Sequence, residues 1–381
     1  FGFSAKMVMR LAQNLYERGL ITYHRTDSFN LSTSFVFKAK DFIANLYGPQ
    51  YALKKPRGYK TRSKSAQEAH EAIRPTKLER TPRMLEKENS LTASHKKIYE
   101  LIYNRAVATQ MADAKIKQIE IFIQGEKGYL FESEHSKIIF DGFLKVLNPA
   151  YVKKAQTEPI MKKDDKVILS DLQSEEKFTL PPPRYSEASL IRVLEEYGIG
   201  RPSTYSPILS LIQDKGYVEK DGRYLMPTNL GTAISDYLSH AFPEVFDLHF
   251  TASMEGGLDD IADQKLQTTE LLRKFYDPFS KLIQKEKEKK ERIKIKEEVV
   301  GVCPQCGSPL TIKRSRFGRF YACTKYPECK FTKSILKLVK GKKCPQCAGN
   351  IVVRYSKKKK RFYGCENYPK CTFATFSYAS L

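Results

Sequence analysis

Cysteine is absent from the first 302 of this chain's 381 residues. The eight cysteines that it has all follow, between Cys303 and Cys371. A chain that used cysteines as ordinary packing residues would have them throughout its length, so this clustering indicates a dedicated cysteine-based site. The C-terminal part is therefore a different kind of structure from the rest.

Long apolar runs are missing as well. No stretch approaches the roughly 18 apolar residues that a membrane span requires, although 41% of the residues are hydrophobic and 29% are charged. That composition excludes both an integral membrane protein and a disordered tail. A length of 381 residues is enough for two or three globular domains.

The chain shows neither an initiating methionine nor a signal peptide. It begins at Phe1 and enters a helical pattern at once. We therefore expect it to be a piece of a longer protein, whose targeting signals would lie outside this sequence.

Acidic residues are outnumbered. The chain has 66 Lys and Arg residues and 43 Asp and Glu residues, which gives a net charge of +23. Residues 299–381 hold eighteen of the basic residues and two of the acidic ones, so +16 of that charge lies there. This excess indicates a polyanionic partner, either nucleic acid or an anionic membrane surface.

The first hundred or so residues show helical periodicity. Helices are expected at residues 4–18, with Ser4 as the cap and Gly19 as the stop, at about 34–46 and at about 94–110. From about residue 115 the pattern alternates instead, which predicts a β-rich region that ends at the prolines of 181–183. Its strands are expected at residues 119–123, 130–131, 138–140 and 166–169.

The next region predicts two helices joined by the loop YGIGRPSTY at residues 197–205, then a short hairpin at about 217–226. This order is the outline of a winged-helix DNA reader, and an ordinary packed α/β subdomain fits it equally well. Residues 285–298, KEKEKKERIKIKEE, form a solvated linker or the exposed end of the preceding helix.

The cysteines fall into two similar units of about forty residues, each opened by CPQC and closed by a second pair. The repetition extends to FYAC against FYGC and YPEC against YPKC, which indicates a duplication. Two cysteine pairs brought together by a hairpin form a closed tetrahedron of thiolates for a structural zinc ion, and the paired spacing favours metal over disulfides. The predicted ligands are Cys303, Cys306, Cys323 and Cys329 for one ion, and Cys344, Cys347, Cys365 and Cys371 for the other.

Aromatic residues alternate with cations around these cysteines. Bases stack on aromatic rings while cations follow phosphates, a mixture that suits single-stranded DNA better than a duplex groove. The alternative is that the rings form the small cores of the ribbons, and we expect this of about half of them. The proposed DNA contacts are Phe320, Tyr321, Phe362 and Tyr363.

Residues 19–32 read GLITYHRTDSFNLS. On an extended segment, Tyr23 and Arg25 point to one face. A phenolate can attack a phosphodiester, and a nearby guanidinium can hold the phosphate and offset its charge. Packing in a core is the usual role of a tyrosine, and this chain has 22 of them.

The segment GLITYHRTDS resembles the active-site segment of bacterial type IA DNA topoisomerases. Further matches follow in the same order, and the resemblance covers nearly the whole chain. They are SAQEAHEAIRP at 65–75, SEASLIRVLEEYGIGRPSTYSPILSLIQDKGYV at 186–218, FTASMEGGLDDIA at 250–262, and the tandem four-cysteine ribbons.

This resemblance implies a multidomain α+β fold, with type IA core domains followed by two zinc ribbons. The expected parts are a helical gate with the active-site tyrosine at 1–110, part of a β-rich arch at 111–182, a winged-helix-like single-strand-binding domain with its charged linker at 183–298, and ribbons at 299–340 and 341–381.

The resemblance also implies an enzyme that cuts one DNA strand through a phosphotyrosine, passes a strand and reseals without ATP, relaxing negative supercoils. Tyr23 would be the nucleophile, Arg25 would contact the scissile phosphate, Asp27 would organise the segment, and His70 would donate a hydrogen bond to a phosphate. The strand-binding loop would be Arg201, Ser203 and Thr204.

Two departures from the family pattern stand out. His24 occupies a position where methionine is usual, and we expect a neutral substitution. The acidic DxDxE motif of the family's N-terminal TOPRIM domain, which binds magnesium and supplies the general acid, has no match here. The chain is therefore expected to bind single-stranded DNA but not to relax DNA alone.

The expected partner is DNA, mainly single-stranded or negatively supercoiled, with no membrane involved. A monomer is expected, in the bacterial cytoplasm at the nucleoid, and the ribbons are candidates for a contact with RNA polymerase. The alternative is a non-catalytic DNA-binding protein with winged-helix and zinc-ribbon modules, in which Tyr23 only packs. A covalent protein–DNA adduct distinguishes the two.

Overall fold

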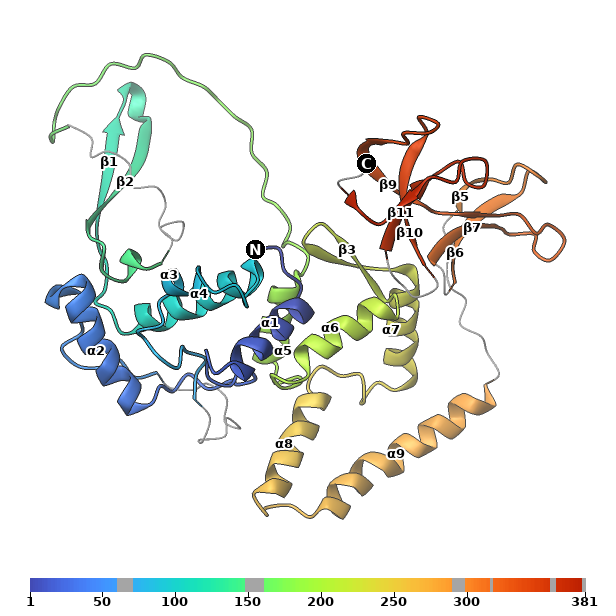
Figure 1. The fold of residues 1–381 in the computed structure, drawn as a ribbon, viewed down its shortest axis with the longest axis horizontal. Coiled ribbons are helices and arrows are strands. Elements are labelled where there is room, and N and C mark those ends of the chain that lie inside the picture. The colour runs from blue at the N-terminus through green and yellow to red at the C-terminus, as the bar shows by residue number, and fades with distance from the viewer. Residues whose placement is uncertain (60–70, 148–160, 290–298, 316–317, 357–360, 379–381) are drawn as a thin grey trace. The chain divides into compact units, whose positions relative to one another are not determined.

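The computed structural model forms two compact units, residues 1–292 and 293–381 (Figure 1). It describes residues 1–59, 71–147, 161–289, 299–315, 318–356 and 361–378. Helices dominate the first unit and strands the second, which confirms the predicted mixed fold with ribbons at the C-terminal end. Within the described residues, no helix is long and apolar enough to cross a membrane.

The first unit opens with the predicted helices, because each has a hydroxyl cap at its start. The side chains of Ser4, Ser32 and Thr92 accept hydrogen bonds from amides in the first turns of α1, α2 and α4. The helices share one core in which Leu15, Ile43 and several neighbours are fully buried. The helices are α1 Ala5–Glu17, α2 Thr33–Tyr47, α3 Pro82–Leu85 and α4 Ala93–Thr109.

Among its described residues, the predicted β-rich region forms one antiparallel hairpin, β1 Lys115–Gln124 and β2 Leu130–Phe140 (Figure 1). The strand expected at residues 138–140 is the end of β2. The strand expected at 166–169 is wrong: residues 161–185 have no regular structure, and Ile168 is 95% exposed. An alternating pattern makes a strand only when a neighbour pairs with its backbone, and none does so here among the described residues.

The helix, helix, hairpin order of the following region is confirmed. The first residue of α5, Glu187, accepts a 2.6 Å hydrogen bond from the amide of Ala5 in α1 and pairs with Lys220 in β3. This carboxylate therefore ties the hairpin and α5 to the beginning of the chain. The elements are α5 Glu187–Glu196, α6 Tyr205–Asp214, β3 Val218–Asp221, β4 Tyr224–Pro227 and α7 Asn229–Ala241.

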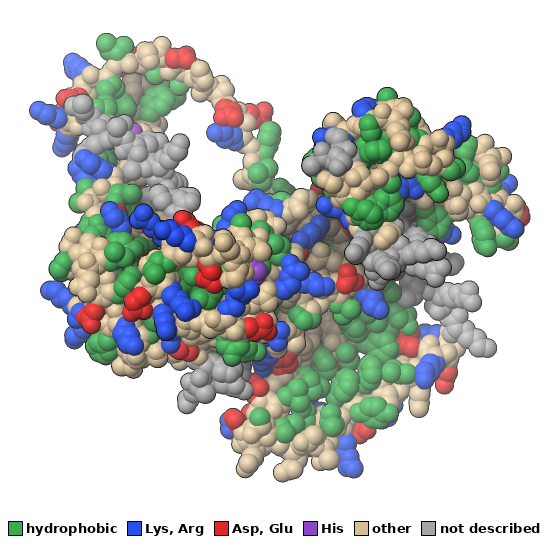
Figure 2. Space-filling view, in the orientation of Figure 1, with side chains coloured by type: hydrophobic (Ala, Val, Ile, Leu, Met, Phe, Trp, Pro, Cys, Tyr) green, Lys and Arg blue, Asp and Glu red, His purple; other side chains and the backbone are tan. Residues whose placement is uncertain are grey.

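Two more helices, α8 Phe250–Ala262 and α9 Thr268–Glu288, complete the first unit. They share an apolar cavity of about 240 Å³ whose walls include Phe250, Met254 and Phe275, and Figure 2 shows hydrophobic side chains gathered there. Residues 285–288 of the charged segment are the exposed end of α9, and 290–298 lie outside the described residues.

The second unit contains two antiparallel sheets of four strands each, with the same strand order in both. This equivalence confirms the duplication. The first sheet has β5 Val299–Val302, β6 Pro309–Ser315, β7 Gly318–Cys323 and β8 Thr332–Ser334, and the second has β9 Lys337–Lys343, β10 Asn350–Tyr355, β11 Arg361–Cys365 and β12 Ala374–Thr375.

Candidate functional site

The segment that follows α1 has no regular helix or strand and bends at Thr22, His24 and Arg25. Gly19 ends the helix with φ +65°, a left-handed conformation that glycine adopts without strain. Tyr23 is 41% exposed and Arg25 is also exposed, whereas His24 between them is only 4% exposed. Tyr23 and Arg25 are thus both accessible to a ligand, and their roles at a phosphate stay predictions.

Two rings pack around Tyr23. The ring of Tyr16, in α1, lies edge-on to it with centroids 5.1 Å apart, and the ring of His24 lies edge-on at 5.4 Å. Within the described part of the chain, neither ring nitrogen of His24 has a hydrogen-bond partner. Burial and then Arg25 lower the pKa of His24, against an opposing effect of Glu17. The imidazole is therefore uncharged, as a methionine would be.

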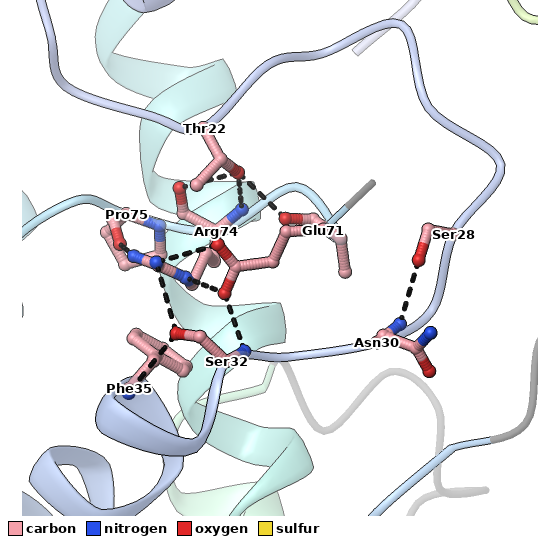
Figure 3. Close-up of polar contacts among 9 residues, drawn as sticks. Thr22, Ser28, Asn30, Ser32, Phe35, Glu71, Arg74 and Pro75 are labelled. Carbon is pink, nitrogen blue, oxygen red and sulfur yellow. Dashed lines mark hydrogen bonds and ion pairs between the residues drawn. The ribbon is translucent and has the colours of Figure 1, made fainter. Parts of the chain in front are cut away.

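The Tyr23 segment is tied down just before the tyrosine, at Thr22. The backbone amide of Thr22 donates to the carbonyl of Arg74 at 2.9 Å, and the amide of Arg74 donates to Thr22 Oγ1, also at 2.9 Å. Thr22 Oγ1 in turn donates to the carbonyl of Ala72 at 2.7 Å. Figure 3 shows Thr22 beside Arg74, and Tyr23 is the next residue in the sequence.

A second anchor lies at the other end of the segment, where α2 begins. The backbone amide of Ser32 donates to Glu71 Oε1 at 2.7 Å. Arg74 binds the same carboxylate with two parallel bonds of 2.7 and 2.8 Å, and its guanidinium lies 4.7 Å from the ring centre of Phe35 (Figure 3). Burial opposes ionisation of Glu71, but the hydrogen bonds from Arg74 and Ser32 prevail and lower its pKa.

Sequence reasoning did not identify these anchoring residues, although Glu71 and Arg74 lie inside the quoted segment 65–75. The available signal was the spacing of a carboxylate and an arginine three positions apart, which allows an ion pair. His70, the residue predicted from that segment, lies outside the described residues.

Asp27 is half-buried, and its charge reaches the YGIGRPSTY loop. The pKa of Tyr205 in that loop is raised first by burial and then by Glu195, with further contributions from Asp27 and Glu255 and an opposing one from Arg201. The Tyr23 segment and this loop therefore lie close enough to influence one another.

Arg201 is held by two carboxylates of α8. It forms ion pairs with Glu255 and, at 2.9 Å, with Asp259. Glu255 also accepts a hydrogen bond of 3.1 Å from the backbone amide of Gly200. The guanidinium is thereby paired with two carboxylates, and the phosphate contact predicted for Arg201 stays a prediction. Its geometry is that of a residue that fastens the loop to α8.

Ser203 and Thr204 are exposed at the start of α6. Thr204 Oγ1 accepts a hydrogen bond of 2.8 Å from the backbone amide of Arg201. The same hydroxyl donates a hydrogen bond of 3.0 Å to the backbone carbonyl of Arg201. The hydroxyl of Thr204 shapes the loop, and both side chains remain accessible to a strand.

The eight cysteines form the two predicted sets. Within each set all four sulfurs lie within 4.8 Å of one another. The closest pairs are 3.4 Å apart for Cys306 and Cys323, and 3.3 Å for Cys347 and Cys365. These distances are too long for disulfides and close to the roughly 3.8 Å edge of a zinc–thiolate tetrahedron. The chain therefore has two structural zinc sites.

The ribbon aromatics divide between two faces. Tyr363 is 6% exposed in the core of the second ribbon, and Tyr321 packs against the core of the first. Phe320 and Phe362, one residue earlier in each strand, are partly exposed on the other side. The predicted base stacking by Tyr363 does not fit this burial, because little of the ring surface is accessible.

Comparison with known proteins agrees with this geometry. A family model described as DNA topoisomerase matches residues 1–273, and one described as topoisomerase DNA-binding C4 zinc finger matches 300–337 and 341–379. The chain belongs to the type IA DNA topoisomerase family. It is 39% identical to DNA topoisomerase 1 of Campylobacter jejuni over 94% of this chain and 54% of the relative.

A solved type IA structure is also similar. The full-length topoisomerase I of Thermotoga maritima superposes with a TM-score of 0.69 at 32% identity, over 88% of this chain and 54% of that one. The chain thus spans about half the length of the type IA topoisomerases it matches.

The described residues hold no carboxylate cluster of the kind that binds magnesium. Among them, the only groups of three or more potential metal ligands are the two cysteine sets. The type IA features present are thus a tyrosine segment, a strand-loop motif and two ribbons.

Proposed function

We propose that this chain supplies the strand-cleaving tyrosine and the strand-binding surfaces of a type IA DNA topoisomerase that relaxes negative supercoils. The observation that carries this proposal is the setting of Tyr23. It is half-exposed beside Arg25, in a segment anchored at both ends, within a match to the family that covers residues 1–273.

In the proposed reaction the Tyr23 oxygen attacks a backbone phosphorus. The Tyr23 hydroxyl gives up its proton, a bond forms between its oxygen and phosphorus, and the bond from phosphorus to the sugar oxygen breaks. The sugar oxygen takes up a proton, so the exchange is balanced in protons. Arg25 offsets the charge that builds on the phosphate oxygens, and His70 donates a hydrogen bond to a phosphate. Attack by the released hydroxyl reverses every step, so resealing needs no ATP.

The proton for the sugar oxygen and the magnesium ion come, in this proposal, from an N-terminal domain with the DxDxE motif. Among the described residues, the only groups of three or more potential metal ligands are the two cysteine sets. We therefore expect the 381 residues alone to bind single strands without cleaving or relaxing DNA. The two zinc ions have four thiolate ligands each and no open position, so their role is to fold the ribbons.

DNA binding is proposed for the loop hydroxyls of Ser203 and Thr204 and for the exposed ring faces of Phe320 and Phe362. The net charge of +16 beyond residue 298 supports a polyanionic partner. Preference for single strands, a monomeric state, nucleoid association and contact with RNA polymerase stay predictions.

The experiment joins this chain to an N-terminal domain that carries the DxDxE motif and incubates it with an end-labelled oligonucleotide and magnesium. A covalent adduct that maps to Tyr23 by mass spectrometry is the expected result. Tyr23→Phe should give no adduct, whereas the matched control Tyr129→Phe, at a 67% exposed tyrosine of the hairpin, should give the wild-type amount. No adduct in the wild-type protein would favour the non-catalytic DNA-binding alternative.

A further inference from the structure

We infer that Glu71 and Arg74 are positioning residues for Tyr23: their ion pair sets where the tyrosine sits for attack on the phosphate, without touching the DNA. This inference rests on the proposed function, because it assigns the pair a role in the reaction of the same site.

The pair itself is built as a rigid fork. Both nitrogens on one edge of the guanidinium bind both oxygens of the carboxylate, at 2.7 and 2.8 Å. The side chains are only 14% and 27% exposed. Parallel charge-assisted bonds of this kind fix orientation as well as distance. Arg74 also donates to the carbonyl of Pro75 at 3.0 Å, so its own backbone is held in place.

The fork is connected to both ends of the Tyr23 segment. At the far end, Glu71 accepts the amide of Ser32, whose hydroxyl caps α2. At the near end, the backbone of Arg74 exchanges hydrogen bonds with Thr22. Residues 71–74 therefore act as a short brace across the segment (Figure 3), and Tyr23 directly follows the attachment point Thr22 in the sequence.

The brace acts on position and not on general stability. The other polar contacts of the guanidinium, with Pro75 and Ser32, join the same two segments. The buried core formed by α1, α2 and α4 consists mainly of apolar side chains. Loss of the fork is therefore expected to loosen residues 20–32 while the helices stay folded.

A small displacement at Thr22 moves Tyr23 by a similar amount, since the two are adjacent. Misplacing a reacting group by about 1 Å can cost on the order of 100-fold in rate. Binding of the strand, which the proposal assigns to other residues, should be little affected. The expected signature is a lower kcat with an unchanged KM.

The test compares Arg74→Ala, Arg74→Lys and Glu71→Gln with a matched control, Arg57→Ala, which removes an arginine–carboxylate pair of 2.8 Å with Asp113 outside the brace. Cleavage is measured over a range of oligonucleotide concentrations, up to saturation, in the protein joined to the DxDxE domain. Arg74→Ala should lower kcat about 10- to 100-fold at constant KM. Lysine keeps the charge but not the fork, so Arg74→Lys should recover part of the loss.

Hydrogen exchange of the 381-residue chain provides a readout that does not depend on activity. Residues 20–32 should exchange faster in Arg74→Ala and not in Arg57→Ala, while peptides from α4 stay protected. Where the wild-type protein cleaves, unchanged exchange of residues 20–32 or an unchanged kcat in Arg74→Ala overturns the positioning role. A wild-type protein that forms no adduct overturns the proposed function instead, and the exchange result then decides whether the brace exists.

Discussion

The imidazole of His24 lies edge-on to the phenol ring of Tyr23, with centroids 5.4 Å apart and planes at 67°. It is buried next to the cation of Arg25, and no described residue forms a hydrogen bond with it. A charged imidazolium could not remain there without cost, because neither its burial nor its neighbour favours the charge. The packing around Tyr23 therefore depends on a neutral His24.

This dependence predicts a loss of stability in mild acid. The pKa of His24 is lowered in the folded chain, first by burial. Unfolding then takes up a proton between the folded and unfolded pKa values, so the stabilising contribution is present above about pH 6.5 and is lost as the pH falls. Urea unfolding is measured at pH 7.5 and pH 5. The free energy of unfolding should fall less between these two pH values in His24→Met than in the wild type.

The matched control for that experiment is His240→Met, at an exposed histidine of α7. It should keep the full acid dependence. His95, whose pKa is also lowered by burial, is present in all three proteins and gives the same background. An equal fall in the free energy of unfolding from pH 7.5 to pH 5 in the wild type and in His24→Met would contradict the account.

A second prediction concerns Arg201, which Glu255 and Asp259 neutralise. If it fastens the loop and does not contact phosphate, Arg201→Ala should lower the thermal stability of the first unit but leave the salt dependence of single-strand binding unchanged. Plots of log affinity against log salt measure this. A slope reduced by roughly 0.7, the value for one lost phosphate contact, would contradict it.

A third prediction concerns the zinc ions. Elemental analysis should find two zinc ions per chain, because each ribbon has a complete set of four thiolates. Chelation should unfold residues 299–378 while the first compact unit keeps its helical circular dichroism, since binding energy in such sites is folding energy. Unfolding of both compact units together on chelation would contradict this prediction.

A fourth prediction separates the two faces of the second ribbon. Phe362→Ala should weaken single-strand binding by about 1–3 kcal/mol, the usual value of one stacked base, with the ribbon still folded. Tyr363→Ala removes a ring that is 6% exposed in the core and should unfold the ribbon or release its zinc. Equal effects on binding and folding in both variants would count against the assignment of faces.

Local signals were the reliable ones. Ser4 and Gly19 mark the two ends of α1, and the cysteine spacing marks both metal sites, because caps and short hairpins are encoded within a few residues. The strand expected at 166–169 failed because pairing depends on a distant partner. The carboxylates that bind Arg201 come from α8, more than fifty residues later, so no local pattern could reveal them.

The site shows the same division. The exposed setting of Tyr23 and Arg25 followed from an alternating segment. The brace of Glu71 and Arg74 did not, because its bonds reach Ser32 and Thr22 across about forty and fifty residues of chain. The long-range contacts that hold a reactive group in place are thus the part that needed the structure.

The most direct test of the central claim is the mapping of a covalent DNA adduct in the protein joined to a DxDxE domain. The account predicts one phosphotyrosine, on Tyr23, that forms with magnesium, disappears when the strand is resealed, and is absent in Tyr23→Phe. An adduct on another residue, or one that persists in Tyr23→Phe, would contradict it.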